Sequence, residues 1–149
     1  MHEKMEKNEP DELQVWVKQR LDVAVKELIN NSVFESLLVE AKPAWVYPFQ
    51  VLIGKIREHG SSKTFEWLIC GEVPTDFVNS AVASTPREAA RYFAMKWQLE
   101  VARHKDLSEQ KSPGPVPQLR EPGNQLAETA EALYELIDDE NLWQQQDGF

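Results

Sequence analysis

Cysteine and histidine are scarce in this chain, and their scarcity removes several kinds of chemistry. Cys70 is the only cysteine among 149 residues, so one chain cannot build a disulfide framework. The three histidines are His2, His59 and His104, and no spacing typical of a zinc or calcium site accompanies them. We therefore expect neither a metal site nor a cofactor.

Long apolar runs and an excess of basic residues are also missing. No stretch approaches the ~20 apolar residues that span a bilayer, and residues 1–11 are too polar for a secretory signal. The formal net charge is −9, whereas nucleic-acid-binding proteins usually present a basic face. We expect a cytoplasmic protein that binds neither a membrane nor nucleic acid.

The sequence motifs of the common enzyme classes do not occur either. There is no nucleophile elbow, P-loop or dinucleotide-binding glycine pattern. Glu100 and His104 are four residues apart and could share a metal on a helix, but a metal site needs more ligands, so we interpret them as a solvated pair. Cys70 lies in an apolar run, where cysteine is usually a small buried hydrophobe. We expect no catalytic residue.

The residues that are present fit a single α+β domain over residues 1–149. Hydrophobic residues make up 42% of the chain, and a chain of this length can bury a substantial core. We predict helices packed around a small antiparallel β-hairpin or short sheet, with helix predominating. Residues 1–9 are expected to be a disordered start.

Two helices are predicted before residue 43. Apolar residues recur at helical spacing over residues 10–29, from Leu13 to Leu28. Ser32 and Glu35 match a capping box, which predicts a second helix that ends at Lys42, before Pro43. The two would form an αα-hairpin.

Alternating apolar residues indicate two strands in the middle of the chain. They lie at residues 49–54 and 65–70, and residues 58–63 have the composition of a loop. A β-hairpin alone is marginally stable in water. A third strand near residues 45–47, the helices or another subunit must therefore extend or cover it.

The second half of the chain is predicted to hold two more helices. Thr85, Pro86 and Glu88 suit the N-cap, N1 and N3 positions of a helix that reaches about Lys105. Residues 112–123 contain four prolines and should be an extended linker to a C-terminal helix over residues 124–143. Residues 84–111 carry six basic and four acidic side chains, and residues 112–149 one basic and eight acidic. We expect the last helix to fold back onto the basic one, mainly through its apolar stripe.

Candidate binding residues follow the second predicted strand. Residues 71–77 leave that strand and lead toward the capped helix, so their polar groups could line a pocket. Arg87 and Arg91 could face Asp76 or bind an anion at the helix start. Alternatively, the segment is a turn in which Thr75 or Asp76 caps backbone amides. With the aromatic anchor Trp67, the candidate binding set is Trp67, Thr75, Asp76, Arg87 and Arg91.

Residues 66–98 resemble a known family. The run of residues 66–77, EWLICGEVPTDF, leads through residues 85–93, TPREAARYF, to Trp97-Gln98. It is similar to domain-of-unknown-function family 4826, an uncharacterised bacterial family of small cytoplasmic proteins, and the resemblance in length and order covers nearly the whole chain. The family has no assigned activity, so the resemblance implies no mechanism. Its members commonly carry Tyr where this chain has Phe77, which argues against a role for a hydroxyl there.

Three functions remain open at this point. The first is a non-catalytic protein-interaction or regulatory module that binds a partner protein or a second copy of itself. The second is a small-ligand-binding protein or an unrecognised enzyme with a pocket near Asp76 and Arg87. The third is an acidic antagonist of a basic partner, which would use the carboxylates of the last helix, namely Glu128, Glu131, Glu135, Asp138 and Asp139.

Overall fold

The computed structural model describes residues 2–31, 39–58, 64–109 and 123–143. In chain order its elements are α1 (His2–Asn30), β1 (Val39–Tyr47), β2 (Val51–Glu58), β3 (Glu66–Gly71), β4 (Asp76–Asn79), the 3₁₀ turn η1 (Ser80–Val82), α2 (Pro86–Glu109), α3 (Gly123–Asp138) and the 3₁₀ turn η2 (Glu140–Leu142). The strands form one antiparallel sheet in the order β1-β2-β3-β4. The predicted α+β class is confirmed.

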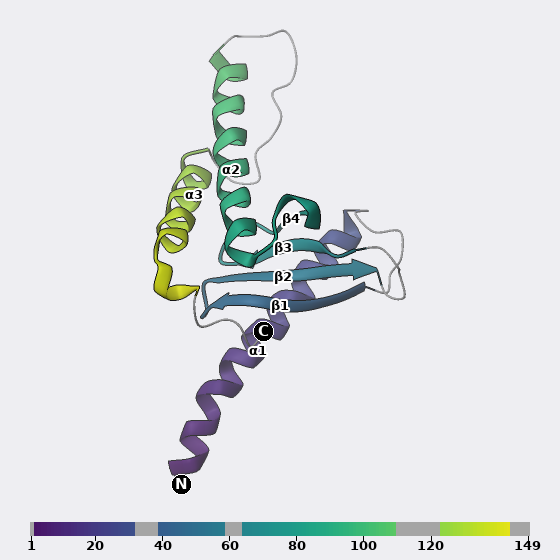
Figure 1. Cartoon of the computed structure of the whole chain (residues 1–149), viewed down its shortest axis with the longest axis vertical. Helices are drawn as coiled ribbons and strands as arrows, with labels where there is room; N and C mark the ends of the chain where they lie inside the picture. The colour runs from purple at the N-terminus through teal and green to yellow at the C-terminus, as the bar shows by residue number, and fades with distance from the viewer. Residues whose placement is uncertain (1, 32–38, 59–63, 110–122, 144–149) are drawn as a thin grey trace.

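Helices of the same chain cover both faces of the sheet (Figure 1). Side chains of a strand alternate between faces, so Ile53 packs toward α2 and α3 while Leu52 packs toward α1. Both are fully buried, and burial of such a side chain stabilises the fold by roughly 1.5–3 kcal/mol. The two apolar faces of the predicted hairpin are thus covered without another subunit.

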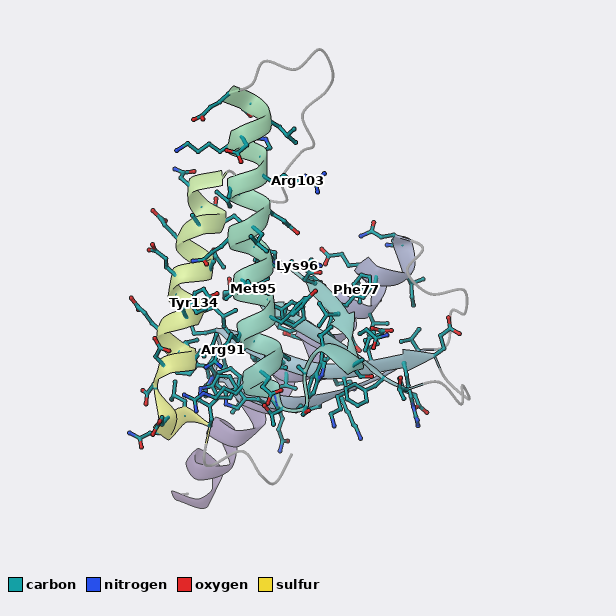
Figure 2. All side chains as sticks on the ribbon, turned by 45° about the horizontal axis from the view of Figure 1, so that its top comes forward. Phe77, Arg91, Met95, Lys96, Arg103 and Tyr134 are labelled. Atoms are coloured by element: carbon teal, nitrogen blue, oxygen red, sulfur yellow. The ribbon has the colours of Figure 1, made fainter. Side chains whose placement is uncertain are left out.

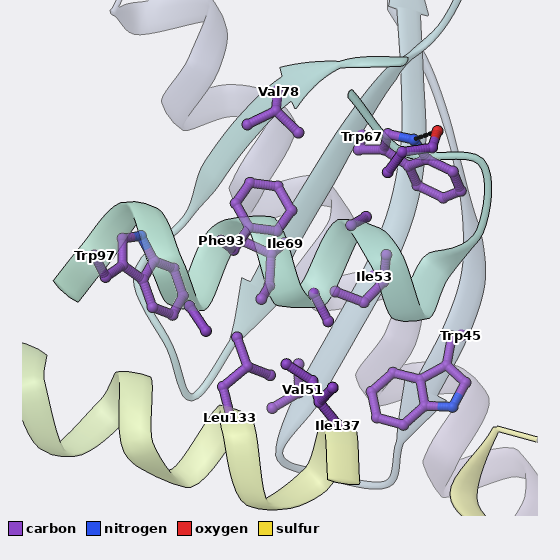
Figure 3. Packing of buried hydrophobic residues seen from close by; sticks show 14 of the residues in the cluster. Trp45, Val51, Ile53, Trp67, Ile69, Val78, Phe93, Trp97, Leu133 and Ile137 are labelled. Atoms are coloured by element: carbon purple, nitrogen blue, oxygen red, sulfur yellow. Dashed lines mark hydrogen bonds between the residues drawn. The ribbon is translucent and has the colours of Figure 1, made fainter. Parts of the chain in front are cut away.

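The second half of the chain forms the predicted pair of helices, although α3 ends at Asp138 and not at residue 143, and the turn η2 follows it. The Glu88 amide donates to Thr85 Oγ1 at 3.1 Å, and the Ser84 amide donates to the Glu88 carboxylate at 2.9 Å, so the capping box starts α2 as expected. The helix α3 lies along α2 (Figure 1), and its inward residues are all buried. Figure 3 shows Leu133 and Ile137 of α3 on the same core as Phe93 and Trp97 of α2.

Two predictions for the first half of the chain are wrong. The helix α1 begins at His2 instead of Pro10, because most residues before Pro10 are strong helix formers. The helix expected to reach Lys42 is also wrong, since β1 begins at Val39 and pairs with β2. Residues 39–43 alternate between apolar and charged as well, and pairing with β2 favours this shorter period. The predicted strand near residues 45–47 is confirmed as the end of β1.

The predictions for the other strands, loops and linkers are met in part. The two predicted hairpin strands correspond to β2 and β3. The polar loop expected after residue 74 contains the strand β4 and the turn η1. The predicted helix at residues 32–38, most of the loop between β2 and β3, and nearly all of the proline-rich linker lie outside the described residues.

Candidate functional site

Asp76 is the buried polar residue of the candidate set. It is the first residue of β4, its exposed fraction is 1%, and it lies on the face of the sheet covered by α2. Its Oδ1 accepts hydrogen bonds from Lys96 Nζ at 2.9 Å and from the Phe77 amide at 2.8 Å, and its Oδ2 accepts one from Trp97 Nε1 at 3.1 Å. A buried carboxylate needs such partners, so Asp76 joins β4 to α2.

The two arginines of the candidate set have other positions. Arg87 Nε donates to the Ile137 carbonyl at 2.9 Å, in the last turn of α3, where a cation suits the helix dipole. Arg91 is exposed, and Figure 2 shows it on the α3 side of α2, whereas Lys96 lies toward Phe77. These bonds join Asp76 to α2 and Arg87 to α3, and the bond from the Phe77 amide fits the alternative in which Asp76 caps a backbone amide. The basic partner comes from Lys96, further along α2.

Trp67 and Thr75 have different roles in the structure. Trp67 is 1% exposed, and its Nε1 donates to the Ala83 carbonyl at 2.9 Å, which fixes the connection between η1 and α2 (Figure 3). Thr75 lines a hollow of about 660 Å³ formed by residues 71–77 together with α1 and the start of α3. Three carboxylates border it, of which Glu72 forms an ion pair with Arg20 and Asp76 one with Lys96, and the third is Glu27.

A larger groove of about 960 Å³ runs between α1 and β1. Most of its wall is apolar. Its side chains come from α1 (Leu13, Gln14, Val17, Lys18, Leu21, Asp22, Val25), from β1 (Val39, Ala41, Pro43, Trp45, Val46, Tyr47) and from Pro48, Asn141 and Leu142.

The groove lies beside an unpaired sheet edge. Because β1 is the first strand in the sheet order, only β2 hydrogen-bonds to it, and its other edge has no strand beside it among the described residues. Figure 1 shows the N-terminal part of α1 extending past this edge. An apolar groove next to a free strand edge can accept an extended segment of another chain.

The groove was not predicted from the sequence, because the first part of β1 was expected to be helical. A signal was nevertheless present, since Val39, Ala41 and Pro43 alternate with Glu40 and Lys42. The spacing of a strand puts the first three on one face, and these three line the groove.

The remaining features to consider are the Cys70 thiol, possible metal ligands, possible membrane helices and the carboxylates of α3. The Cys70 side chain is buried, and burial raises the pKa of its thiol to about 12. No group of three or more His, Cys, Asp or Glu residues in the described part of the chain is arranged to hold a metal ion. Within the same residues no helix is both long and apolar enough to cross a membrane. The five carboxylates of the third hypothesis, on and just after α3, are all exposed.

Comparison with known proteins identifies the family. The family described as "Domain of unknown function (DUF4826)" matches residues 10–143, and the chain belongs to it. No curated protein and no solved structure matches the chain. The match covers α1, the sheet and both later helices, so the groove and the Asp76 contacts lie within the matched region.

Proposed function

We propose that this protein is a non-catalytic protein-interaction module whose binding surface is the groove between α1 and β1. The observation that carries the proposal is the combination of a mainly apolar groove of about 960 Å³ with an edge of β1 that has no other strand beside it in the described part of the chain. A bound segment would hydrogen-bond to the β1 backbone and place alternate side chains in the groove.

The settings of Asp76 and Cys70 support a non-catalytic role. The Asp76 carboxylate is engaged by α2, and the Cys70 thiol is buried with a raised pKa, so neither is poised as a base or a nucleophile. The same proposal places the protein in the cytoplasm, where a lone thiol stays reduced.

Peptide selection tests this proposal directly. Peptides from a random display library are selected on the immobilised full-length protein, and their affinities are measured for wild type, Val17→Lys and Val23→Lys. Val17 lines the groove, whereas Val23 is a 54% exposed valine of the same helix outside it. We expect Val17→Lys to weaken binding at least roughly tenfold and Val23→Lys to leave it unchanged.

Amide hydrogen exchange provides the structural readout. A peptide that adds to the sheet should slow exchange along β1. Peptides that bind both variants equally, or that leave β1 exchange unchanged, would contradict the proposal.

A second candidate function rests on the hollow formed by residues 71–77. Because Glu72 and Asp76 are paired with Arg20 and Lys96, Glu27 would be the carboxylate that receives a small cationic ligand, such as a polyamine or a basic amino acid. Thermal-shift measurements with a panel of such compounds test it, with Glu27→Gln as the variant that removes one border charge. A ligand at 100 times its dissociation constant should add about 2.7 kcal/mol to stability, so a uniform lack of stabilisation would count against this function.

A further inference from the structure

We infer that the segment bound at the β1 edge is the β1 strand of a second copy of this chain, paired antiparallel about a two-fold axis at Ala41. The inference rests on the proposed function and names its partner. This pairing of the two β1 strands would join two four-stranded sheets into one continuous sheet.

Charge complementarity carries the choice of partner. In an antiparallel pair centred on Ala41, Glu40 of one copy lies opposite Lys42 of the other, and the two-fold axis repeats the pair. Facing residues of opposite charge stabilise paired strands, and facing like charges destabilise them. The β1 edge is thus complementary to itself.

The same charges exclude the neighbouring registers. A pair centred on Glu40 would oppose Glu40 to Glu40, and a pair centred on Lys42 would oppose Lys42 to Lys42. Shifts by a single residue would place side chains of opposite faces against each other. Among these registers only the one centred on Ala41 pairs opposite charges.

The surroundings of Lys42 favour an added carboxylate. Lys42 is exposed, and its register partner on β2 is Lys55, a like charge. Glu40 bonds to Arg57 Nε of β2 at 2.8 Å, and both side chains are about half exposed. The partner's Glu40 would bring a carboxylate to Lys42, while Lys55 Nζ lies over the Phe65 ring, 4.5 Å from its centroid.

The other face of the pair would bury apolar surface. In this register Ala41 faces Ala41, and Val39 of each copy faces Pro43 of the other. All three residues line the groove, so the two grooves would meet on one side of the joined sheet. Lysine and proline on an edge strand usually prevent indiscriminate pairing. Pro43 has no N–H to donate and the register of β1 shifts after it, so the added pairing would end at Pro43.

Charge exchange on the full-length protein tests the register. Sedimentation and light scattering should show a concentration-dependent dimer at up to about 100 μM, where micromolar contacts are populated. Glu40→Lys and Lys42→Glu should each weaken the dimer roughly tenfold, since each replaces two attractive pairs by two repulsive pairs.

An equimolar mixture of these two variants should restore the dimer. One copy then carries lysine at both positions and the other copy carries glutamate at both, so every facing pair between unlike copies joins opposite charges. Arg57→Ala is the matched control. It removes the internal partner of Glu40 without changing the edge, and it should dimerise like wild type.

Cysteine crosslinking gives an independent measurement, with Cys70→Ala in every variant so that only the introduced thiol reacts. Facing residues of an antiparallel pair have Cα atoms about 4.5–5.5 Å apart, within the range of a disulfide. Ala41→Cys should therefore form a covalent dimer under mild oxidation. The two Val39 residues would lie four positions apart, roughly 13 Å, so Val39→Cys should not.

The outcomes separate this inference from the proposed function. A strict monomer would overturn the inference, and so would a dimer whose affinity is unchanged by the charge exchanges and whose two cysteine variants crosslink alike. If selected peptides still bind wild type and lose affinity for Val17→Lys, the groove remains a protein-binding site with a different partner. If peptide binding also fails, the proposed function falls as well.

Discussion

Replacing Asp76 should destabilise the protein more than replacing any exposed carboxylate. Asp76→Ala removes the acceptor of the buried Trp97 indole N–H and of the Phe77 amide, and a buried group left without its hydrogen bond costs about 1–3 kcal/mol. The Lys96 side chain is 32% exposed and can turn toward water, so the loss of its ion pair with Asp76 should lower the free energy of unfolding by a smaller amount. A buried charge is itself unfavourable, so its removal by Asp76→Ala offsets part of this loss of stability. We expect a loss of about 3 kcal/mol.

Asp76→Asn refines this prediction, because it keeps the size of the side chain. The amide nitrogen that it introduces must face a donor, either Lys96 Nζ or Trp97 Nε1, so we expect a loss of about 1–2 kcal/mol. Lys96→Met alone should also destabilise, because it removes the lysine cation from the buried carboxylate. When both substitutions are combined the two losses should not add, with a coupling of about 1 kcal/mol or more.

Equilibrium unfolding in urea, followed by tryptophan fluorescence, measures these free energies, because Trp97 lies beside Asp76. Asp138→Asn, at an exposed position on α3, is the matched control and should stay within about 0.5 kcal/mol of wild type. If Asp76→Asn were as stable as wild type, the carboxylate would not be what joins β4 to α2, and this role of Asp76 would be refuted.

Three further predictions concern other contacts. Arg87→Ala should lower the free energy of unfolding by about 1–2 kcal/mol through loss of its bond to the last turn of α3, whereas Arg91→Ala, at an exposed position, should change it little. Gly71→Ala should cost about 2–4 kcal/mol in denaturant unfolding, because φ is +115° and an added Cβ would lie 2.5 Å from the Gln50 carbonyl oxygen; a loss below about 1 kcal/mol would contradict that geometry. Burial raises the pKa of the Cys70 thiol from 9.0 to about 12, so the unfolded chain releases this proton first, and stability should fall as pH rises from about 9 toward 12, by up to about 1.4 kcal/mol per pH unit. Unfolding of Cys70→Ala measured over the same pH range should lack this part of the slope.

The elements with two independent local signals were predicted well. The start of α2 had both a capping box and proline at N1, and β2 and β3 had both alternation and β-forming residues. The region around residues 32–42 had conflicting signals, a capping box and helical spacing against the alternation of residues 39–43. Sequence alone could not decide between them, because the pairing of Ala41 with Ile56 of β2 is a tertiary contact.

The candidate site was predicted less well than the fold. Asp76 was among the candidates because it lies between a predicted strand and a capped helix, where polar groups can line a pocket. Arg87 and Arg91 were considered as its partners because they stand at the helix start, and a turn capped by Asp76 was the alternative. The choice of Lys96 and Trp97 depends on where β4 meets α2, and β4 itself is only four residues long and was expected to be loop. The groove was missed for the same reason as the first half of β1.

The order of the strands has a consequence for synthesis on the ribosome. Each strand pairs with the one made just before it, so the sheet can assemble from local hairpins as the chain emerges. Other bonds join residues far apart in the chain, and in one of them Trp45 Nε1 donates at 2.9 Å to the Leu142 carbonyl, 97 residues later. The Trp45 indole can make this bond only after Leu142 has been translated, and the ring of Trp143 then stacks on it with centroids 3.9 Å apart.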